Sequence, residues 1–365
     1  MTVENEKRVG VNSGGMDQSA SILSLADHAL YISFYPTLSP TQIALPETDP
    51  PTCFVIADSL KVSDKVVSAN IHYNLRVVET LVGARVLAHK LGLEVEPKRR
   101  ITLREVVGQW AGEKQGEPED PIALERNLTK FEEEVERILG SGNGKDGLTM
   151  EEMISASGLE AEQFHDVYLS WVEGKVPSSL HPHGTPSEPN ATVEATHFQL
   201  YKRVKHVYSE ARRVLEFRRI CIESRSDVNV HIKLGELMDA SQKSCDELFD
   251  CSCDELNKLT SLAKSAGAWG SRLTGVLESP YQLQYLVNFG LASGAGWGGS
   301  TVSLVTVSEV SGFIENLRKT YKPYQNFDDA ALRRVIFATR PGSGAGGESA
   351  GLILSAFKRA TSLDL

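Results

Sequence analysis

The stretch from residue 270 to residue 299 reads GSRLTG, then VLESPYQLQYLVNFGLASG, then AGWGG. Each glycine-rich piece, 270–275 or 295–299, is a weak signal when taken alone. Such a piece is more often a tight turn, because glycine adopts backbone conformations that other residues avoid. Joined, the two pieces form one motif, GSRLTGAGWGG. The joined motif is the strongest indication of the fold, and the segment 276–294 interrupts it.

A second glycine-rich stretch, GVNSGGMDQSA, occupies residues 10–20. Gly14 and Gly15 allow a sharp turn or a close approach of the backbone to a ligand. Asp17 follows at the expected start of a helix, where the helix dipole favours a carboxylate over its acid form. A carboxylate displayed there can accept a proton from a hydroxyl nucleophile. The plainer alternative is that Asp17 only caps the first turn.

Composition restricts the class of protein. The 365 residues are 41% hydrophobic and 24% charged, which is typical of a globular chain with a packed core. The net charge of −10 argues against a nucleic-acid partner, which needs a basic face to neutralise phosphates. We expect no membrane span, because no apolar run approaches about 20 residues. Five cysteines without a CxxC pair indicate reduced thiols, and we expect a cytoplasmic protein without a protein-bound metal.

Hydrophobic periodicity predicts alternating helices and strands without a repeat. The clearest helix is 121–139, where apolar residues recur on one face and Pro121 suits the first turn. The predicted strands are 28–35, 52–60, 299–306 and 333–339. The other predicted helices are 74–92, 150–157, 161–172, 195–222, 232–250, 254–266 and 309–322. The sequence therefore predicts an α+β fold.

Two further segments complete a pattern. Residues 72–79 read HYNLRVVE, and residues 236–262 read ELMDASQKSCDELFDCSCDELNKLTSL. Together with GVNSGGMDQ and GSRLTGAGWGG, they resemble the galactokinases, a family of the GHMP small-molecule kinases, and in particular those of fungal type. The resemblance runs in order from about residue 9 to about residue 342. It favours galactokinase over other GHMP kinases, such as mevalonate or homoserine kinase.

The resemblance implies a reaction and a site. In the family, Mg²⁺ and ATP phosphorylate the anomeric hydroxyl of galactose, giving galactose 1-phosphate. By position in the motifs, Asp17 would be the base or charge partner for that hydroxyl, and Tyr73 would contact the sugar. Gly14 and Gly15 would shape the sugar pocket. The ATP phosphates would lie near three glycines of a weak motif, Gly296, Gly298 and Gly299. Alternatively, Tyr73 is a core aromatic residue at a helix start.

Two further motifs of the family do not occur in these 365 residues. One carries the arginine opposite the catalytic acid, and the other is the loop that cradles the ATP phosphates. Neither GSGNGK at 140–145 nor GSGAGG at 342–347 fits a phosphate loop, because the first lacks the required Ser or Thr and the second lacks a lysine. We therefore expect this chain to be inactive as a kinase. The alternative function is a non-catalytic galactose sensor that binds a transcriptional repressor.

The resemblance also implies the domain organisation. Residues 1–60 would be a remnant of the N-terminal kinase domain, and residues 61–345 the GHMP kinase C-terminal domain, with helices on a small antiparallel sheet. Residues 346–365 would form a C-terminal tail. The segment 276–294 is an anomalous insert whose 19 codons would correspond to 57 nucleotides, about the size of a small fungal intron. We interpret it as a retained intron rather than an evolved lid, and we expect it to pack poorly.

Overall fold

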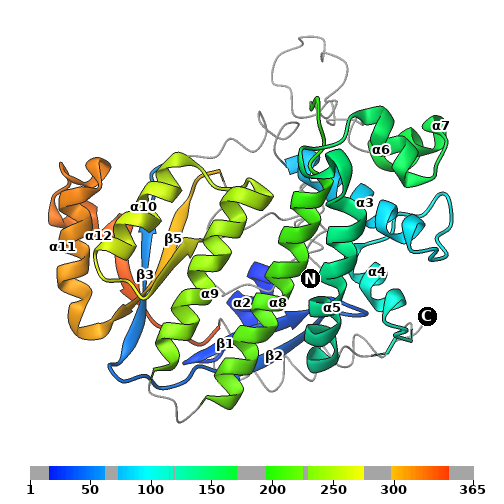
Figure 1. Ribbon diagram of the computed structural model, residues 1–365. Helices are drawn as coiled ribbons and strands as arrows, with labels where there is room; N and C mark the ends of the chain where they lie inside the picture. The colour runs from blue at the N-terminus through cyan, green and yellow to red at the C-terminus, as the bar shows by residue number, and fades with distance from the viewer. Residues whose placement is uncertain are drawn as a thin grey trace, which may run out of the picture. The chain divides into compact units, whose positions relative to one another are not determined.

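The structure is a computed structural model, and it describes residues 16–61, 73–114, 116–117, 120–170, 195–224, 229–274 and 297–344. The chain forms two compact units. Unit 1 comprises residues 1–62, 213–243 and 252–365, and unit 2 comprises residues 63–212 and 244–251. Figure 1 labels the elements of both.

Unit 1 is built on a four-stranded antiparallel sheet of strand order β4-β5-β3-β6. The four strands are β3 (Thr52–Asp58), β4 (Gly270–Leu273), β5 (Ser300–Thr306) and β6 (Ile336–Thr339). In Figure 1, β3 lies between β5 and the last strand, although β3 is far from both in sequence. Every residue of β5 is buried, as expected for a strand covered on both faces.

Three helices contribute to the main core of unit 1: α10 (Asp254–Ser265), α11 (Val310–Thr320) and α12 (Asp329–Val335). Their buried side chains pack with residues of β3, β5 and β6 into one apolar cluster. Leu259 of α10 and Leu317 of α11 are fully buried there, together with Val55 of β3. This arrangement confirms the predicted α+β fold with helices on a small antiparallel sheet.

A second, smaller part of unit 1 consists of helix α2 (Met16–Leu23) and a hairpin of β1 (His28–Ser33) and β2 (Ser39–Ala44). Met16, Leu30 and Ile32 form a small apolar cluster between the helix and the hairpin. Strand β2 has the sequence SPTQIA, and the sequence analysis misses it because this segment has no alternating apolar pattern.

Strand β4 lies at one edge of the four-stranded sheet and packs against helix α9 (Val230–Ser244). The approach is close, since a Cβ atom on Gly270 would lie 2.3 Å from the carbonyl oxygen of Gly235. The side chain of Asp239 accepts from the N–H of Ser271 at 2.9 Å, and that of Gln242 accepts from the N–H of Leu273 at 2.7 Å. The interpretation of 270–275 as a tight turn is therefore wrong. Residues 270–273 form a strand, and the missing side chain of Gly270 allows helix α9 to approach it closely.

Unit 2 is helical in its described part. Helix α3 (Tyr73–Lys90) is buried over most of its length, as expected for a central helix surrounded by others. Around it the unit contains α4 (Leu103–Trp110), α5 (Pro121–Leu139), α6 (Met150–Ser157), α7 (Ala161–Phe164), the π-turn His165–Leu169 and the first half of α8 (Leu200–Glu223). A Cβ atom on Gly83 would lie 2.5 Å from Cγ2 of Val204, so α3 and α8 approach closely.

Most predicted elements are confirmed, and the differences have local causes. Helix α5 has the predicted bounds, and Asp120 caps it just before Pro121. The predicted helix 232–250 continues from α9 into the π-turn Cys245–Phe249. The predicted strand 333–339 begins as helix α12, because Asp328 caps a helix that runs to Val335. Helix α4, which the sequence analysis misses, begins with a capping box of Thr102 and Glu105.

Strand β3 folds with the C-terminal part of the chain, because it pairs with both β5 and β6. Pairing alone does not define a domain, so the boundaries at residues 60 and 345 stay predictions. The insert 276–294 and the tail 346–365 lie outside the described residues. None of the helices that the structure describes is long and apolar enough to cross a membrane.

Candidate functional site

Asp17 is the second residue of helix α2, so the predicted helix start is confirmed. Its carboxylate would therefore lie in the first turn, at the positive end of the helix dipole. The side chain of Asp17 is outside the described part of the structure, as are Gly14 and Gly15. The roles given to these three residues stay predictions.

Gly299 joins the end of β3 to the beginning of β5. Its carbonyl oxygen accepts from the N–H of Ser59 at 2.8 Å and from the Ser59 hydroxyl at 2.5 Å. Its own N–H donates to the carbonyl of Lys61 at 3.0 Å. Both backbone groups of Gly299 are thus used within the protein, so its N–H is not available to a phosphate oxygen. What Gly299 contributes is its shape, with φ at 87°, where glycine is favoured.

Two further residues beside Gly299 have unusual backbone conformations. Leu60 follows the end of β3 with φ at 61°, and Trp297 precedes the glycines with φ at 54°. A left-handed conformation costs a residue with a side chain roughly 1–2 kcal/mol. Such conformations concentrate at functional sites, where the surrounding structure holds them in place. The corner made by residues 59–61 and 297–299 is therefore the best-supported local site in unit 1.

The sheet end at this corner is firmly held. The hydroxyl of Tyr321 donates to the carbonyl of Ser59 at 2.7 Å. Burial raises the pKa of Tyr321 to about 12, and the nearby acidic groups add to this effect, so the phenol remains a donor at neutral pH. Lys61 pairs with Glu255 of α10 at 3.3 Å. Of the other predicted phosphate residues, Gly298 is buried in this corner, and Gly296 lies outside the described residues.

Tyr73 is the first residue of helix α3, which confirms that it stands at a helix start. Its side chain is not among the described ones, so its contact with a sugar stays a prediction. Tyr73 belongs to unit 2, whereas Asp17, Gly298 and Gly299 belong to unit 1. The predicted site residues are thus divided between the two units.

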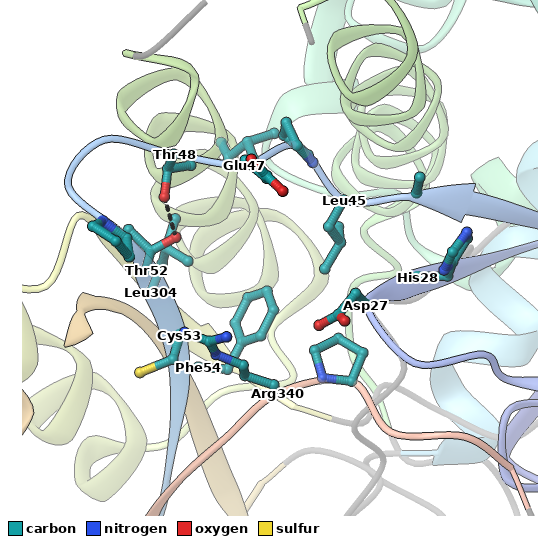
Figure 2. A pocket seen from close by; sticks show the side chains of 15 residues that line it. Asp27, His28, Leu45, Glu47, Thr48, Thr52, Cys53, Phe54, Leu304 and Arg340 are labelled. Atoms are coloured by element: carbon teal, nitrogen blue, oxygen red, sulfur yellow. Dashed lines mark hydrogen bonds between the residues drawn. The ribbon is translucent and has the colours of Figure 1, made fainter. Parts of the chain in front are cut away.

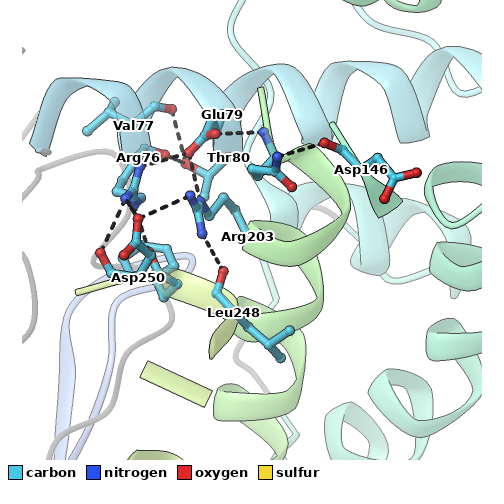
Figure 3. A network of polar contacts seen from close by, with 10 residues as sticks. Arg76, Val77, Glu79, Thr80, Asp146, Arg203, Leu248 and Asp250 are labelled. Carbon is cyan, nitrogen blue, oxygen red and sulfur yellow. Dashed lines mark hydrogen bonds and ion pairs between the residues drawn. The ribbon is translucent and has the colours of Figure 1, made fainter. Parts of the chain in front are cut away.

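A buried charge network lies one helical turn after Tyr73 (Figure 3). The guanidinium of Arg76 donates to the carbonyl of Phe249 at 2.7 Å and to Oε2 of Glu79 at 3.2 Å. It also pairs with the carboxylate of Asp250. Arg76 is 2% exposed and Glu79 is fully buried. Burial is the main cause that lowers the pKa of Arg76, with Arg203 as a second cause, and the two acids oppose them.

Arg203 of helix α8 completes this network. Its Nε donates to Oε2 of Glu79 at 2.8 Å, and its Nη1 donates to the carbonyl of Leu248 at 2.7 Å. The other carboxylate oxygen of Glu79 accepts from the N–H of Gln199 at 2.7 Å. The network therefore joins the segment HYNLRVVE to the segment 236–262, although Arg76 and Asp250 are 174 residues apart in sequence.

Arg76, Glu79 and Asp250 are not among the functional residues predicted from the sequence. A signal is present, because Arg76 and Glu79 lie among the apolar residues of a helix that is buried on nearly all sides. Charged residues are almost never fully buried unless they are paired. Two charges of opposite sign, three residues apart within an apolar helix, could have indicated a buried network.

Unit 1 also contains an open cavity of about 520 Å³ at the other end of β3 (Figure 2). Its lining includes Thr52, Cys53 and Phe54 at the start of β3, with Arg340 and Asp27 nearby. Burial raises the pKa of the Cys53 thiol, against the opposing effect of Arg340. Gly298 and Gly299, the predicted site residues that the structure describes in full, are not part of the lining of this cavity. It is separate from the corner at Gly299, which meets the far end of the same strand.

Comparison with known proteins agrees with the ordered motifs. No protein-family model matches the chain. The galactokinase of Saccharomyces cerevisiae is 33% identical over 371 residues, an alignment that covers 94% of this chain and 61% of the relative. The galactokinase of Dictyostelium discoideum is 34% identical over 365 residues, with the same coverage. The chain is similar to these galactokinases along nearly its whole length.

This similarity agrees with the resemblance that the motifs carry. The chain spans about three-fifths of the length of these relatives. A solved structure of Lactococcus lactis galactokinase in complex with galactose aligns with 93% of this chain. The alignment covers 57% of the Lactococcus lactis chain, with 18% sequence identity and a TM-score of 0.49.

Proposed function

We propose that the protein represented by this chain is a galactokinase that transfers the γ-phosphoryl group of ATP to the anomeric hydroxyl of galactose. The observation that carries the proposal is its identity to galactokinases, 33% and 34%, along 94% of the chain. The predicted motifs also occupy positions that suit a site. Asp17 is the second residue of α2, and Trp297, Gly298 and Gly299 belong to the strained corner before β5.

In this proposal, Asp17 accepts the proton of the anomeric hydroxyl or stabilises the developing charge, and Tyr73 contacts the sugar. Gly14 and Gly15 shape the sugar pocket, and Gly298 lies near the phosphates. ATP supplies the phosphoryl group, and Mg²⁺ would enter with it and neutralise its charge. Among the described residues, no group of His, Cys, Asp and Glu has an arrangement that could hold a metal ion, so we assign no metal ligand. We place the protein in the cytoplasm.

We further propose that the 365-residue chain does not turn over ATP by itself. Phosphoryl transfer depends almost wholly on positioning and charge stabilisation. The two family motifs that supply the phosphate loop and the arginine opposite the acid do not occur in this sequence. In the family, the first of these motifs also carries an acid and a histidine that hold the sugar, so we expect the chain to retain at most a weakened affinity for galactose.

The test is a coupled kinase assay on two proteins, this chain and a version joined to the two missing motifs, with 276–294 removed from the latter. We expect galactose-dependent ADP release from the second protein only. In that protein, Asp17→Ala should lower kcat by about 10²–10⁴-fold, typical of the loss of a general base. Its fold should persist, since a first-turn carboxylate contributes at most about 1 kcal/mol.

Two outcomes would contradict the proposal: turnover by the 365-residue chain, or near-normal kcat in the Asp17→Ala variant. A longer protein that binds galactose and ATP without turnover would instead favour the alternative, a galactose sensor that binds a transcriptional repressor.

A further inference from the structure

The turn that precedes Asp250 is held in place by contacts with helix α8 within unit 2. The π-turn Cys245–Phe249 is held to helix α8 by Arg203, which donates to the carbonyl of Leu248. His206 of the same helix stacks on Phe249 with ring centroids 4.5 Å apart, and its Nδ1 lies 2.8 Å from the hydroxyl of Ser244. Because both ends of the turn are tied to one long helix, the turn is a rigid support for whatever binds to it.

The first turn of α3 binds to this support through Arg76. Three donors of its guanidinium meet acceptors on residues 249 and 250 and on Glu79. The first four N–H groups of a helix have no partner within the helix, so its first turn depends on contacts with its surroundings. Apolar packing of residues such as Leu75 holds this turn against the unit but is not directional. The forked guanidinium is directional, and it fixes both the rotation and the axial position of the turn.

The burial of these charges needs a reason other than stability. Burying two ions costs several kcal/mol in desolvation, and apolar replacements of buried ion pairs are often as stable or more stable. Here Arg76 and Glu79 are almost completely buried. Directional pairing of buried charges can instead select one arrangement among several close ones. The arrangement selected here is that of the helix turn which begins with Tyr73.

We propose that Arg76, Glu79, Arg203 and Asp250 position the first turn of α3 so that Tyr73 can contact galactose. They are positioning residues and do not themselves contact the sugar. The inference rests on the proposed function, because it assigns a galactose contact to Tyr73. It adds that the segments HYNLRVVE and 236–262 act together, one carrying the sugar contact and the other its support.

Asp250 is the residue at which this inference is best tested. Its φ is 55°, a conformation that Asn adopts as readily as Asp, so Asp250→Asn preserves the backbone and the size of the side chain. Its side chain is 65% exposed, so the Asn amide stays hydrated, and Glu79 is then the one carboxylate of this network left to balance the buried guanidiniums of Arg76 and Arg203. Arg76→Lys is the second variant, because it retains the positive charge and loses the fork.

A matched control lies elsewhere in unit 2. Glu136 forms a comparable network, accepting from the hydroxyl of Tyr201 at 2.5 Å and pairing with Lys145. Glu136→Gln removes one exposed carboxylate from a network of ion pairs, as Asp250→Asn does. The network of Glu136 joins helices α5 and α8 and does not involve the first turn of α3.

The experiment combines hydrogen exchange and galactose titration on the full 365-residue chain. The amides of Val77 and Val78 bond to the carbonyls of residues 73 and 74 in an α-helix, so their exchange reports on the first turn. We expect Asp250→Asn and Arg76→Lys to speed this exchange at least fivefold and to weaken galactose binding about 5–10-fold by calorimetry. Tyr73→Phe should weaken binding without changing the exchange, and Glu136→Gln should change neither.

Unchanged exchange at residues 77 and 78 in Asp250→Asn would overturn the inference, as would faster exchange with unchanged galactose affinity. If Arg76→Lys does not fold, Asp250→Asn still tests the inference, because the side chain at position 250 is exposed and its replacement is less disruptive to folding. Failure of the proposed function is a separate outcome, since neither the unmodified chain nor the chain joined to the two missing motifs would then bind galactose.

Discussion

Deleting residues 276–294 should stabilise the protein, because the strands that flank this segment already meet. Leu273 of β4 pairs with Thr301 of β5, and the N–H of Thr274 donates to the carbonyl of Ser300 at 2.9 Å. After the deletion, six residues (275 and 295–299) would join Thr274 to Ser300 in place of 25. This length is ample for an antiparallel hairpin, whose connections are commonly two to five residues.

The magnitude follows from loop closure. Each doubling of loop length costs about 0.6 kcal/mol, and shortening the connection from 25 to six residues is about two halvings. The deletion should therefore raise the free energy of unfolding by about 1.2 kcal/mol, or the Tm by roughly 1–2 °C for a chain of this length. Differential scanning calorimetry on the two proteins measures this change.

A second variant separates the length of the segment from its sequence. Replacing 276–294 by nineteen residues of Gly and Ser keeps the loop length, so it should leave the Tm near that of the unmodified chain. If instead the deletion lowers both the Tm and the solubility, the segment is an integral element and the interpretation as a retained intron loses its main support. Sequencing cDNA across codons 270–300 tests the same interpretation at its source.

Three further predictions concern single side chains. Tyr73→Phe should weaken galactose binding by about 0.5–1.5 kcal/mol, the net contribution of one hydrogen bond, as measured by calorimetry; an unchanged Kd would remove Tyr73 from the sugar site. Gly83→Ala should destabilise the protein by roughly 1–3 kcal/mol in urea unfolding, because its Cβ would overlap Val204, whereas Gly312→Ala, with no atom within 4 Å, should be neutral or stabilising; equal effects would contradict the close contact of α3 and α8. Burial raises the pKa of Cys221 from 9.0 to about 12, so the unfolded thiol ionises first, and the stability present below pH 9 is lost progressively up to about pH 12. At pH 10 the loss is about 1.4 kcal/mol, and Cys221→Ala should lack this component in urea titrations at pH 8 and pH 10.

How much of the structure could be predicted depends on whether local pattern or distant contact decides each element. Helix α5 is predicted to the residue because its apolar face and its cap, Asp120 with Pro121, are both local in sequence. Strand β4 is not predicted, since its residues GSRL show no alternation of apolar and polar side chains. They form a strand because β5 lies on one side and α9 on the other, and neither neighbour can be inferred from four residues.

The candidate site shows the same division. The motifs place Asp17 and Tyr73 at helix starts, and both placements are confirmed. The partners of Arg76 could not be predicted in this way, because the acceptors on residues 249 and 250 are mostly backbone carbonyls. A carbonyl carries no sequence signal, so only the fold could reveal that these two segments meet.

The contact between α9 and β4 has a consequence for the behaviour of the protein in concentrated solution. An edge strand offers a row of N–H and C=O groups to which a strand of another molecule can add. Here Asp239 and Gln242 occupy the donors of Ser271 and Leu273, so a helix takes the place of the next strand. Two side chains, one turn apart on α9, thereby protect the β4 edge of the sheet from edge-to-edge pairing with another copy.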